Sequence, residues 1–343
     1  MKILFYSVKD FEQALLLEKN TAGFLVRMTN LALSEKTAEL AGGFDVISIF
    51  TGDDASAPVI ERLQAAGVKF IAIRAAGYDN VDLVKAAEAH IQVANVPAYS
   101  PFAIAEHALA LMLALDRKLI TANRQVQQQN FSMNNLIGFN LYRKTVGIIG
   151  TGNIGAALIK LLKGFECRIL AYDIQKNEEL ATYDRLHYVN MQQLCSESDI
   201  ISIHTPLNEQ TRHIINAASI ALMKKGVMII NTSRGGCVDT EAVVQFLDNG
   251  HIGYFGADVY EKEKGLFFYD CSNREINDPV LKKLLQFPNV LITPHQAFAT
   301  NEALDNIATT TFDTINCWAE NRYSQNELYH VPLSQPPQVV KPL

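Results

Sequence analysis

The feature that most constrains this chain is the run of residues 145–160, Thr-Val-Gly-Ile-Ile-Gly-Thr-Gly-Asn-Ile-Gly-Ala-Ala-Leu-Ile-Lys. It predicts a buried strand, a glycine turn and the first turns of a helix. At this spacing Gly150 makes the tight turn, Gly152 lets a pyrophosphate approach the backbone, and Gly155 lets helix and strand pack closely. The pattern predicts dinucleotide binding; a glycine-rich turn in another kind of α/β unit is the alternative.

Two neighbouring features narrow this prediction. No Lys-Ser or Lys-Thr pair follows Gly155, which excludes a phosphate loop of the Walker kind. Asp173 closes the next expected strand, 18 positions after Gly155. At that distance a carboxylate meets the adenine ribose hydroxyls, and it would repel the additional phosphate of NADP. The sequence therefore predicts NAD as the cofactor.

Composition excludes several other classes of protein. The chain has 343 residues, enough for one or two domains, and its 30 basic and 36 acidic residues give a net charge of −6. An acidic chain without a basic stripe argues against nucleic acid as a partner. No apolar run reaches the roughly 20 residues that a membrane helix needs. The N-terminus enters a strand at once and lacks a secretory pattern, so we expect a cytoplasmic protein.

The five cysteines give no sign of a metal or disulfide framework. They are scattered, odd in number and form no Cys-x-x-Cys pair. We expect them to be small packing residues of a reduced protein. No HExxH pattern occurs either, so we expect no metal site.

The glycine turn normally opens its domain, yet here more than 140 residues precede it. Short apolar runs that alternate with helical stretches predict a first α/β domain with a parallel sheet covered on both faces. Its expected strands are Lys2–Ser7, Phe24–Met28, Asp45–Phe50, Lys69–Arg74 and Ile91–Val96, and its expected helices are Lys9–Asn20, Ala57–Ala66 and Val81–Ala89.

The second domain follows an apolar helix, Phe102–Leu119, and a polar stretch, Thr121–Asn140, which we interpret as surface or partner-contacting structure. Six strands then fit a doubly wound sheet. A last helix, Glu302–Glu320, is expected to cross back to the first domain. The predicted domains are therefore 1–100 with 299–343, and 101–298. The six strands are Val146–Ile149, Arg168–Tyr172, Ile200–Ile203, Val227–Asn231, Tyr254–Val259 and Val290–Thr293.

Chemically capable residues follow these strands. Ligands of open α/β sheets bind outside the carboxyl ends of the strands, so the residues that come next share one rim. Alone, a histidine or arginine at such a place is more often structural, and Glu261 and Glu263 could belong to a charged surface run. Together the residues surround a dinucleotide. The segments are His204-Thr205-Pro206, Thr232-Ser233-Arg234, Asp258 with Glu261 and Glu263, and Pro294-His295.

This set suits the reduction of a 2-oxo acid. A guanidinium can hold the substrate carboxylate and polarise the carbonyl. A histidine can supply the proton of the alcohol. A carboxylate beside that histidine favours its charged form and orients it.

The chain resembles the D-2-hydroxyacid dehydrogenase family, in particular its fermentative D-lactate dehydrogenase branch. The resemblance covers nearly the whole chain and implies an α/β fold with a Rossmann dinucleotide-binding domain and a flavodoxin-like substrate domain. Its markers are Ala75-Ala-Gly-Tyr-Asp-Asn-Val-Asp82, Val96-Pro-Ala-Tyr-Ser-Pro-Phe-Ala-Ile-Ala-Glu-His107, the glycine turn, His204-Thr-Pro-Leu207, Asn231-Thr-Ser-Arg-Gly-Gly236, Asp258-Val-Tyr-Glu-Lys-Glu263 and Thr293-Pro-His-Gln-Ala-Phe298.

The resemblance implies a role for each matching residue. Arg234 falls on the catalytic arginine, His295 on the acid/base and Glu263, rather than Glu261, on its paired glutamate. The backbone of Ala76 and Gly77 matches the turn that holds the substrate carboxylate, and Tyr99 and Phe298 match pocket positions. We also assign Arg74 to substrate binding, although many relatives carry a small residue there. Assigned to the cofactor besides the glycines and Asp173 are Asn153, Ile154, His204, Thr205, Pro206, Thr211, Thr232, Ser233 and Asp258.

The branch implies NADH-dependent, reversible reduction of pyruvate to D-lactate, and a homodimer that in some members pairs into a tetramer. The insertion Gly265–Asp270 and the aromatic Phe298 favour this branch. The alternatives are the same chemistry on phenylpyruvate, 2-oxobutyrate, glyoxylate or hydroxypyruvate and, from another class, a dinucleotide-sensing corepressor. Corepressors usually add interaction tails, whereas only a short proline-containing tail, Val331–Leu343, follows the last helix here.

Overall fold

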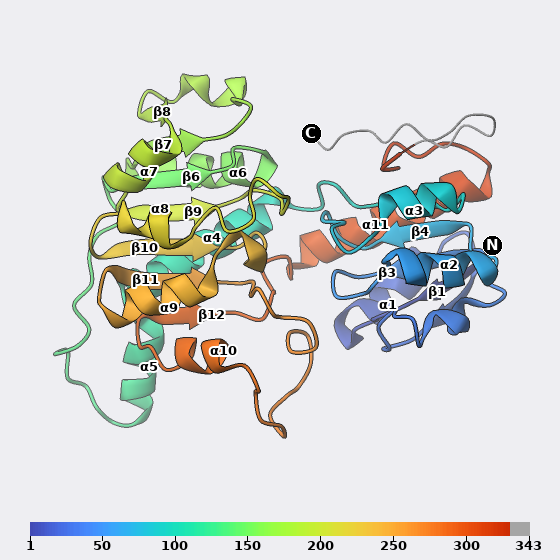
Figure 1. The fold of residues 1–343 in the computed structure, drawn as a ribbon, viewed down its shortest axis with the longest axis horizontal. Coiled ribbons are helices and arrows are strands. Elements are labelled where there is room, and N and C mark those ends of the chain that lie inside the picture. The colour runs from blue at the N-terminus through green and yellow to red at the C-terminus, as the bar shows by residue number, and fades with distance from the viewer. Residues whose placement is uncertain (330–343) are drawn as a thin grey trace. The chain divides into compact units, whose positions relative to one another are not determined.

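The computed structural model describes residues 1–329, so the tail Val331–Leu343 lies outside the described residues. The chain forms two compact units. Unit 1 comprises Met1–Ser100 and the chain from Ala299 onward, and unit 2 comprises Pro101–Phe298. Each contains its own parallel sheet, which confirms the α/β class (Figure 1).

Unit 1 contains a five-stranded sheet in the order β2-β1-β3-β4-β5, the order of flavodoxin-like folds. Successive residues of a strand point to opposite faces, so Leu4 enters one core while Ile3 and Phe5 enter another. The strands are β1 (Lys2–Phe5), β2 (Leu25–Met28), β3 (Val46–Ile49), β4 (Phe70–Ile73) and β5 (Gln92–Ala94).

Helices cover both faces of this sheet. The core that contains Leu4 includes side chains of α2 (Ala57–Ala65), α3 (Leu83–Glu88) and the short 3-10 helix η1 (Ala38–Ala41). The opposite core includes side chains of α1 (Asp10–Lys19) and the last helix, α11 (Asn301–Ala319). The last helix therefore completes the core of the sheet that begins the chain.

Unit 2 contains a seven-stranded parallel sheet in the order β12-β11-β10-β9-β6-β7-β8. Counted from β6, this is the doubly wound order of dinucleotide-binding domains with one strand added at the edge. The strands are β6 (Thr145–Ile149), β7 (Arg168–Tyr172), β8 (Leu186–Tyr188), β9 (Ile200–Ile203), β10 (Val227–Asn231), β11 (Ile252–Ala257) and β12 (Val290–Ile292).

Two layers of helices cover this sheet as well. One core joins the strands to α4 (Pro101–Asp116) and α6 (Asn153–Leu162). The other joins them to α7 (Met191–Glu197), α8 (Ala217–Ala221), α9 (Thr240–Asp248) and α10 (Pro279–Leu284). Short 3-10 helices η2 (Lys163–Phe165), η3 (Glu178–Thr182) and η4 (Gly235–Cys237) complete the unit.

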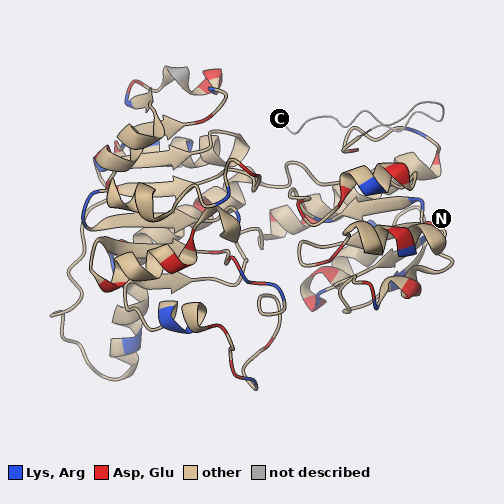
Figure 2. Cartoon of the chain, viewed as in Figure 1, with Lys and Arg blue, Asp and Glu red and all other residues tan. Residues whose placement is uncertain are grey.

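Polar side chains determine where several helices begin. Asp239, Asp278 and Thr300 precede α9, α10 and α11, and each accepts a hydrogen bond from a backbone N–H of the first helical turn. Such caps satisfy N–H groups that have no acceptor within the helix. In each unit Lys and Arg are scattered among Asp and Glu over the elements (Figure 2).

Besides shifts in element bounds and the helices α7 to α10, which were not predicted, three differences from the sequence prediction have a clear cause. Strand β8 was not predicted, because its three residues Leu-His-Tyr form a short edge strand without an apolar run. The polar stretch begins as a helix, α5 (Leu119–Gln127), which buries none of its residues. The apolar helix ends at Asp116 instead of Leu119, since Lys118 takes a left-handed backbone with φ of 50° before α5 starts.

Candidate active site

The carboxyl ends of six unit 2 strands lie in register. The last residues of β7, β6, β9, β10, β11 and β12 pair across the sheet. Adjacent strands of a sheet lie about 4.8 Å apart, so the residues one position further form a continuous row. That row reads Asp173, Gly150, His204, Thr232, Asp258 and Thr293.

Backbone hydrogen bonds extend the sheet into this row. The N–H groups of Gly150, His204, Asp258 and Thr293 donate to the carbonyls of Tyr172, Ile149, Asn231 and Ala257, over 2.7–2.9 Å. Five of the six residues in the row were predicted site residues. The fold thus brings together residues as far apart in the sequence as Gly150 and Thr293.

The predicted acid/base and its predicted carboxylate lie together beside this row. His295 Nδ1 lies 2.9 Å from Glu263 Oε1, and the other Glu263 oxygen accepts a hydrogen bond from the N–H of Tyr260 at 3.0 Å. His295 has a left-handed backbone with φ of 57°, which is uncommon for a non-glycine residue. Both side chains are largely but not fully buried.

The neighbouring acid, Glu261, has a different histidine. His213 Nε2 lies 2.6 Å from Glu261 Oε1, and the His213 N–H donates to the carbonyl of Gly236. The two glutamates of the charged run therefore form two separate pairs. The geometry agrees with the choice of Glu263 as the partner of His295.

Asp258 holds the turn that carries His295. Its side chain is 1% exposed, and one oxygen accepts from the Thr293 hydroxyl at 2.6 Å and the Gln296 N–H at 2.9 Å. The other oxygen accepts from the Ala297 N–H at 2.8 Å. Asp258 therefore supports the turn of His295, and its assignment to the cofactor stays a prediction, because a carboxylate with about four lone-pair sites can accept a further hydrogen bond.

His107 on α4 extends this network. Its Nε2 lies 2.9 Å from the Thr293 hydroxyl and 3.4 Å from Asp258 Oδ1. Because the Thr293 hydroxyl donates its one proton to Asp258, His107 Nε2 must carry a proton and donate to that hydroxyl. This links α4 to the turn of His295.

Arg234 lies in the turn after β10, close to the turn that leads to Glu263. A Cβ at the next residue, Gly235, would lie 2.1–2.3 Å from backbone atoms of Tyr260 and Glu261. Only glycine permits this approach. The Asn231 side chain donates to the Arg234 carbonyl at 2.9 Å and fixes the turn. The half-buried Arg234 is thereby held on the same rim as Glu263 and His295.

The glycine turn has the form that a dinucleotide needs. Gly150 has φ of 94°, and a Cβ at Gly155 would lie 2.0 Å from the Gly150 carbonyl oxygen. A Cβ at Gly152 would meet no other atom of residues 1–329 within 4 Å, so the backbone there is open to a ligand. Asn153, Ile154 and Gly155 form the first turn of α6, whose N–H groups have no acceptor within the helix.

Asp173 lies against this turn from β7. One of its oxygens accepts from the backbone N–H of Thr151 at 2.5 Å and from the Thr151 hydroxyl at 3.0 Å. The other accepts from the N–H of Gln175 at 3.0 Å. The carboxylate is therefore fixed beside the glycine turn, which is where the prediction requires a group that meets the ribose.

Two buried polar atoms on the rim have no partner among the described residues: His204 Nδ1 and the Thr232 hydroxyl. His204 Nε2 lies 2.8 Å from the Ser202 hydroxyl, and burial lowers the pKa of the imidazole to about 4. At neutral pH this histidine is uncharged. Buried polar groups are usually paired, so both atoms fit a site that a ligand completes.

The remaining predicted cofactor residues shape the loop after β9. The Ser233 hydroxyl donates to the Thr205 carbonyl and so links the β9 and β10 loops. The Thr211 hydroxyl donates to the Pro206 carbonyl at 2.6 Å and accepts from the Asn208 N–H at 2.8 Å. Thr211 therefore fixes the turn that contains Pro206.

The predicted pocket residues are divided between the units. Ala76, Gly77 and Tyr99 belong to unit 1, where the Asn95 side chain donates to the Ala76 carbonyl at 2.6 Å and Asn306 of α11 donates to the Tyr99 carbonyl at 2.7 Å. Phe298 is the last residue of unit 2 and is 8% exposed.

Arg74 corrects a prediction. Its guanidinium is 0% exposed and lies inside unit 1. Nε and Nη2 donate to the two oxygens of Glu12 at 3.0 and 3.1 Å, Nη1 donates to the Ser48 hydroxyl, and Nη2 also donates to the Tyr6 carbonyl. With every nitrogen engaged and no exposed surface, Arg74 stabilises the sheet of unit 1 instead of binding substrate.

Sequence reasoning missed three residues that contact the site. His107 and Thr293 lie within quoted motifs, but spacing alone gave no sign of their hydrogen bonds to Asp258. Phe268, within the insertion after Glu263, has its ring centroid 5.3 Å from that of His295. The run of aromatic residues Phe267-Phe268-Tyr269 in that insertion was the one available signal.

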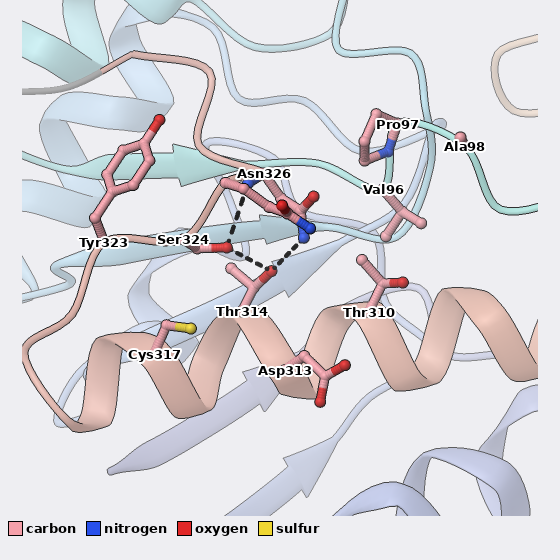
Figure 3. Close-up of a pocket in the computed structure, with 11 residues that line it drawn as sticks. Val96, Pro97, Ala98, Thr310, Asp313, Thr314, Cys317, Tyr323, Ser324 and Asn326 are labelled. Carbon is pink, nitrogen blue, oxygen red and sulfur yellow. Dashed lines mark hydrogen bonds between the residues drawn. The ribbon is translucent and has the colours of Figure 1, made fainter.

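Unit 1 also contains a pocket of about 500 Å³ between α11, the Val96–Ala98 segment and Tyr323–Asn326 (Figure 3). On its wall, the Thr314 hydroxyl accepts from the Ser324 hydroxyl at 3.2 Å and from the Asn326 side chain at 3.1 Å. None of the predicted site residues lines this pocket.

Within residues 1–329, no three or more His, Cys, Asp or Glu side chains are grouped so as to hold a metal ion. Over the same range, every helix is too short or too polar to cross a bilayer.

Known proteins share both the sequence and the fold. The sequence profile described as "D-isomer specific 2-hydroxyacid dehydrogenase, NAD binding domain" matches residues 109–297. The chain is 44% identical over 329 residues to a D-lactate dehydrogenase of Escherichia coli, covering 96% of this chain and 100% of the relative.

Two solved structures are also similar. The pyruvate reductase of Chlamydomonas reinhardtii superposes with a TM-score of 0.88 at 42% identity, covering 95% of this chain and 98% of that chain. The D-lactate dehydrogenase of Aquifex aeolicus, complexed with NAD and lactic acid, superposes with a TM-score of 0.87 at 30% identity, covering 97% and 100%. The chain belongs to the family of D-isomer specific 2-hydroxyacid dehydrogenases, and unit 2 contains its NAD-binding domain.

The glycine turn generates a paired prediction. Gly152→Ala should weaken NADH binding about tenfold or more without lowering the melting temperature, because its Cβ would meet only the ligand. Gly155→Ala should lower both the NADH affinity and the melting temperature, since its Cβ would clash with the Gly150 carbonyl. NADH fluorescence titration and thermal melting measure the two effects. Gly164→Ala, in an open part of η2, is the control, and parent-like NADH binding by Gly152→Ala would contradict the assignment.

The Arg74 network generates a second prediction. Arg74→Met should lower the free energy of unfolding by about 3–5 kcal/mol, because Glu12 is left buried without its partner. Replacing Glu12 by Gln in the same chain should recover part of that loss. Urea denaturation gives the stability, and the KM for pyruvate should stay at the parent value. A raised KM for pyruvate with unchanged stability in Arg74→Met would show that Arg74 binds substrate after all.

Proposed function

We propose that the chain reduces pyruvate to D-lactate with NADH, reversibly. The observation that carries the proposal is the hydrogen-bonded pair of His295 and Glu263, held on the rim that also bears the glycine turn and Arg234. The relatives named for D-lactate and pyruvate chemistry support the choice of substrate.

In this proposal His295 is the acid/base. Its Nδ1 is occupied by Glu263, so Nε2 is the nitrogen that faces substrate. When pyruvate is reduced, protonated Nε2 donates to the carbonyl oxygen as NADH supplies hydride to the adjacent carbon. Glu263 stabilises the imidazolium before the transfer and keeps the ring oriented after it.

Arg234 holds the substrate carboxylate. A planar guanidinium can donate two parallel hydrogen bonds to a carboxylate, and its charge also polarises the neighbouring carbonyl. The resemblance further assigns the backbone of Ala76 and Gly77 and the side chains of Tyr99 and Phe298 to substrate binding. Unit 1 is thus the substrate domain and unit 2 the NAD domain.

The cofactor is held by the row at the strand ends. The pyrophosphate meets the Gly152 backbone and the N–H groups of Asn153 and Ile154, and Asp173 meets the adenine ribose. The assignment to the cofactor extends to His204, Thr205, Pro206, Thr232 and Ser233, with Thr211 supporting the loop. The two unpaired polar atoms at His204 and Thr232 support this placement.

A panel of 2-oxo acids tests the proposal. NADH oxidation should be fastest with pyruvate, and the product should be the D isomer. Faster turnover of phenylpyruvate, 2-oxobutyrate, glyoxylate or hydroxypyruvate would support the same reaction with that acid, instead of pyruvate, as the substrate. Tight NADH binding without turnover of any 2-oxo acid would overturn the enzymatic proposal and favour a dinucleotide sensor.

We further propose a homodimer formed through residues 119–142. Seven large apolar side chains of this segment are exposed, among them Phe131 at 74% and Ile137 at 79%. An apolar surface of this kind is characteristic of an interface. Sedimentation equilibrium distinguishes a monomer, a dimer and a pair of dimers.

A cytoplasmic location is supported by five free cysteines, because disulfides are rare in reducing compartments.

The acid/base assignment predicts the behaviour of two histidine variants. His295→Gln should lower kcat about 10³-fold, since it removes general acid catalysis, while NADH affinity stays at the parent value. His213→Gln is the matched control, because it breaks the other histidine–glutamate pair and should retain most activity. Equal losses of kcat in both variants, measured by steady-state kinetics, would contradict the assignment of His295 as the acid/base.

The carboxylate pair predicts a pH effect. In Glu263→Gln the neutral amide no longer favours the imidazolium, so the protonated form needed for reduction persists only to lower pH. The alkaline limit of pyruvate reduction should move to lower pH. Glu261→Gln, paired elsewhere, should leave the profile unchanged. An unmoved limit in Glu263→Gln would count against the pairing.

A further inference from the structure

The loop that follows Glu263 is anchored to that residue. The N–H groups of Leu266 and Phe267 both donate to the Glu263 carbonyl, at 2.9 and 3.0 Å. The side chains of Leu266 and Phe267 then pack against the core of unit 2. The position of the loop is therefore determined by the residue that pairs with His295.

The backbone turns over at the next residue. Phe268 has a left-handed conformation with φ of 68°, which bulky side chains rarely adopt. Whereas Phe267 packs against the core, the ring centroid of Phe268 lies 5.3 Å from that of His295, and the two ring planes are tilted by 37°. His295 is itself left-handed. Two residues in disfavoured conformations thus meet ring to ring, and such conformations gather at functional sites.

Other contacts hold the loop in this form. Arg274 Nη2 donates to the Gly265 carbonyl and lies 2.7 Å from Cys271 Sγ. The Cys271 thiol in turn lies 3.6 Å from the Leu266 carbonyl. These contacts close the loop on either side of Phe268, so its ring does not depend on His295 alone for its place.

The ring supplies what the hydrogen bond to Glu263 lacks. The hydrogen bond to Glu263 orients the imidazole through Nδ1 but tolerates small rotations of the ring about its Cβ–Cγ bond. A second ring packed beside the imidazole restricts that rotation and so determines where Nε2 points. An aromatic ring within about 6 Å also attracts a cation, which favours the charged imidazolium.

We propose that Phe268 is a positioning residue for His295: its ring orients the imidazole and favours the protonated form that reduces substrate. This rests on the proposed acid/base role of His295. It gives the insertion after Glu263 a part in the reaction, although Phe268 itself exchanges no proton with substrate.

Three variants test the proposal. Phe268→Leu removes the ring but keeps an unbranched Cβ, so the cost of the left-handed backbone is similar. Phe268→Tyr retains the ring and should restore the parent behaviour. Tyr269→Leu is the matched control, because it removes an exposed aromatic ring from the next position of the same loop.

Kinetics give the first readout. Phe268→Leu should lower kcat for pyruvate about tenfold, with the KM for NADH unchanged, and should move the alkaline limit of reduction to lower pH. Phe268→Tyr and Tyr269→Leu should match the parent. A parent-like pH profile in Phe268→Leu, or equal kcat losses in Phe268→Leu and Tyr269→Leu, would overturn the proposal.

Proton NMR of the protein without cofactor gives a readout independent of activity. The imidazole resonance that disappears in His295→Gln should shift in Phe268→Leu, because the ring current of Phe268 is lost, and should stay in place in Tyr269→Leu. If the parent chain turns over no 2-oxo acid, the proposed function fails. The NMR measurement still shows whether the Phe268 ring lies beside the His295 imidazole. An unshifted resonance in Phe268→Leu overturns the proposal even in an active enzyme.

Discussion

The in-register carboxyl ends of the unit 2 strands are the constraint on which the rest of the site depends. Because all seven strands are parallel, every loop that leaves them on this side starts from one edge. The backbone hydrogen bonds that continue the sheet as far as Gly150, His204, Asp258 and Thr293 make the edge rigid. A site built on such a rim needs few contacts of its own, since the sheet already holds the strand ends about 4.8 Å apart.

Close backbone approaches bring the catalytic residues onto that rim. Gly235 lets the Arg234 turn pack against Tyr260 and Glu261, and Gly155 does the same for α6 against the glycine turn. Asp258 then fixes the Thr293–Ala297 turn through three hydrogen bonds, which places His295 next to Glu263. Asp258, which the sequence assigned to the cofactor, thus also supports the turn of His295, and His107 extends that support to α4.

Much of this was accessible from sequence because the patterns are local. The glycine spacing, the apolar runs of the long strands and the motifs around Arg234 and His295 each lie within a few residues. Interactions between distant residues were not accessible. Arg74 was assigned to substrate because nothing nearby indicates its buried bond to Glu12, which is 62 positions away. Strand β8 was missed because an edge strand of three residues needs its neighbour to form.

The sequence by itself determined the α/β class, a turn suited to a dinucleotide, and the residue types from which a 2-oxo acid could be reduced. Only the tertiary structure decided how those residues are paired. Glu261 and Glu263 are two positions apart and chemically identical, yet one meets His213 and the other His295. It likewise placed Phe268 on His295 through one left-handed residue. Such choices depend on how separate loops leave a common sheet edge, and that geometry is not encoded in the spacing of any one loop.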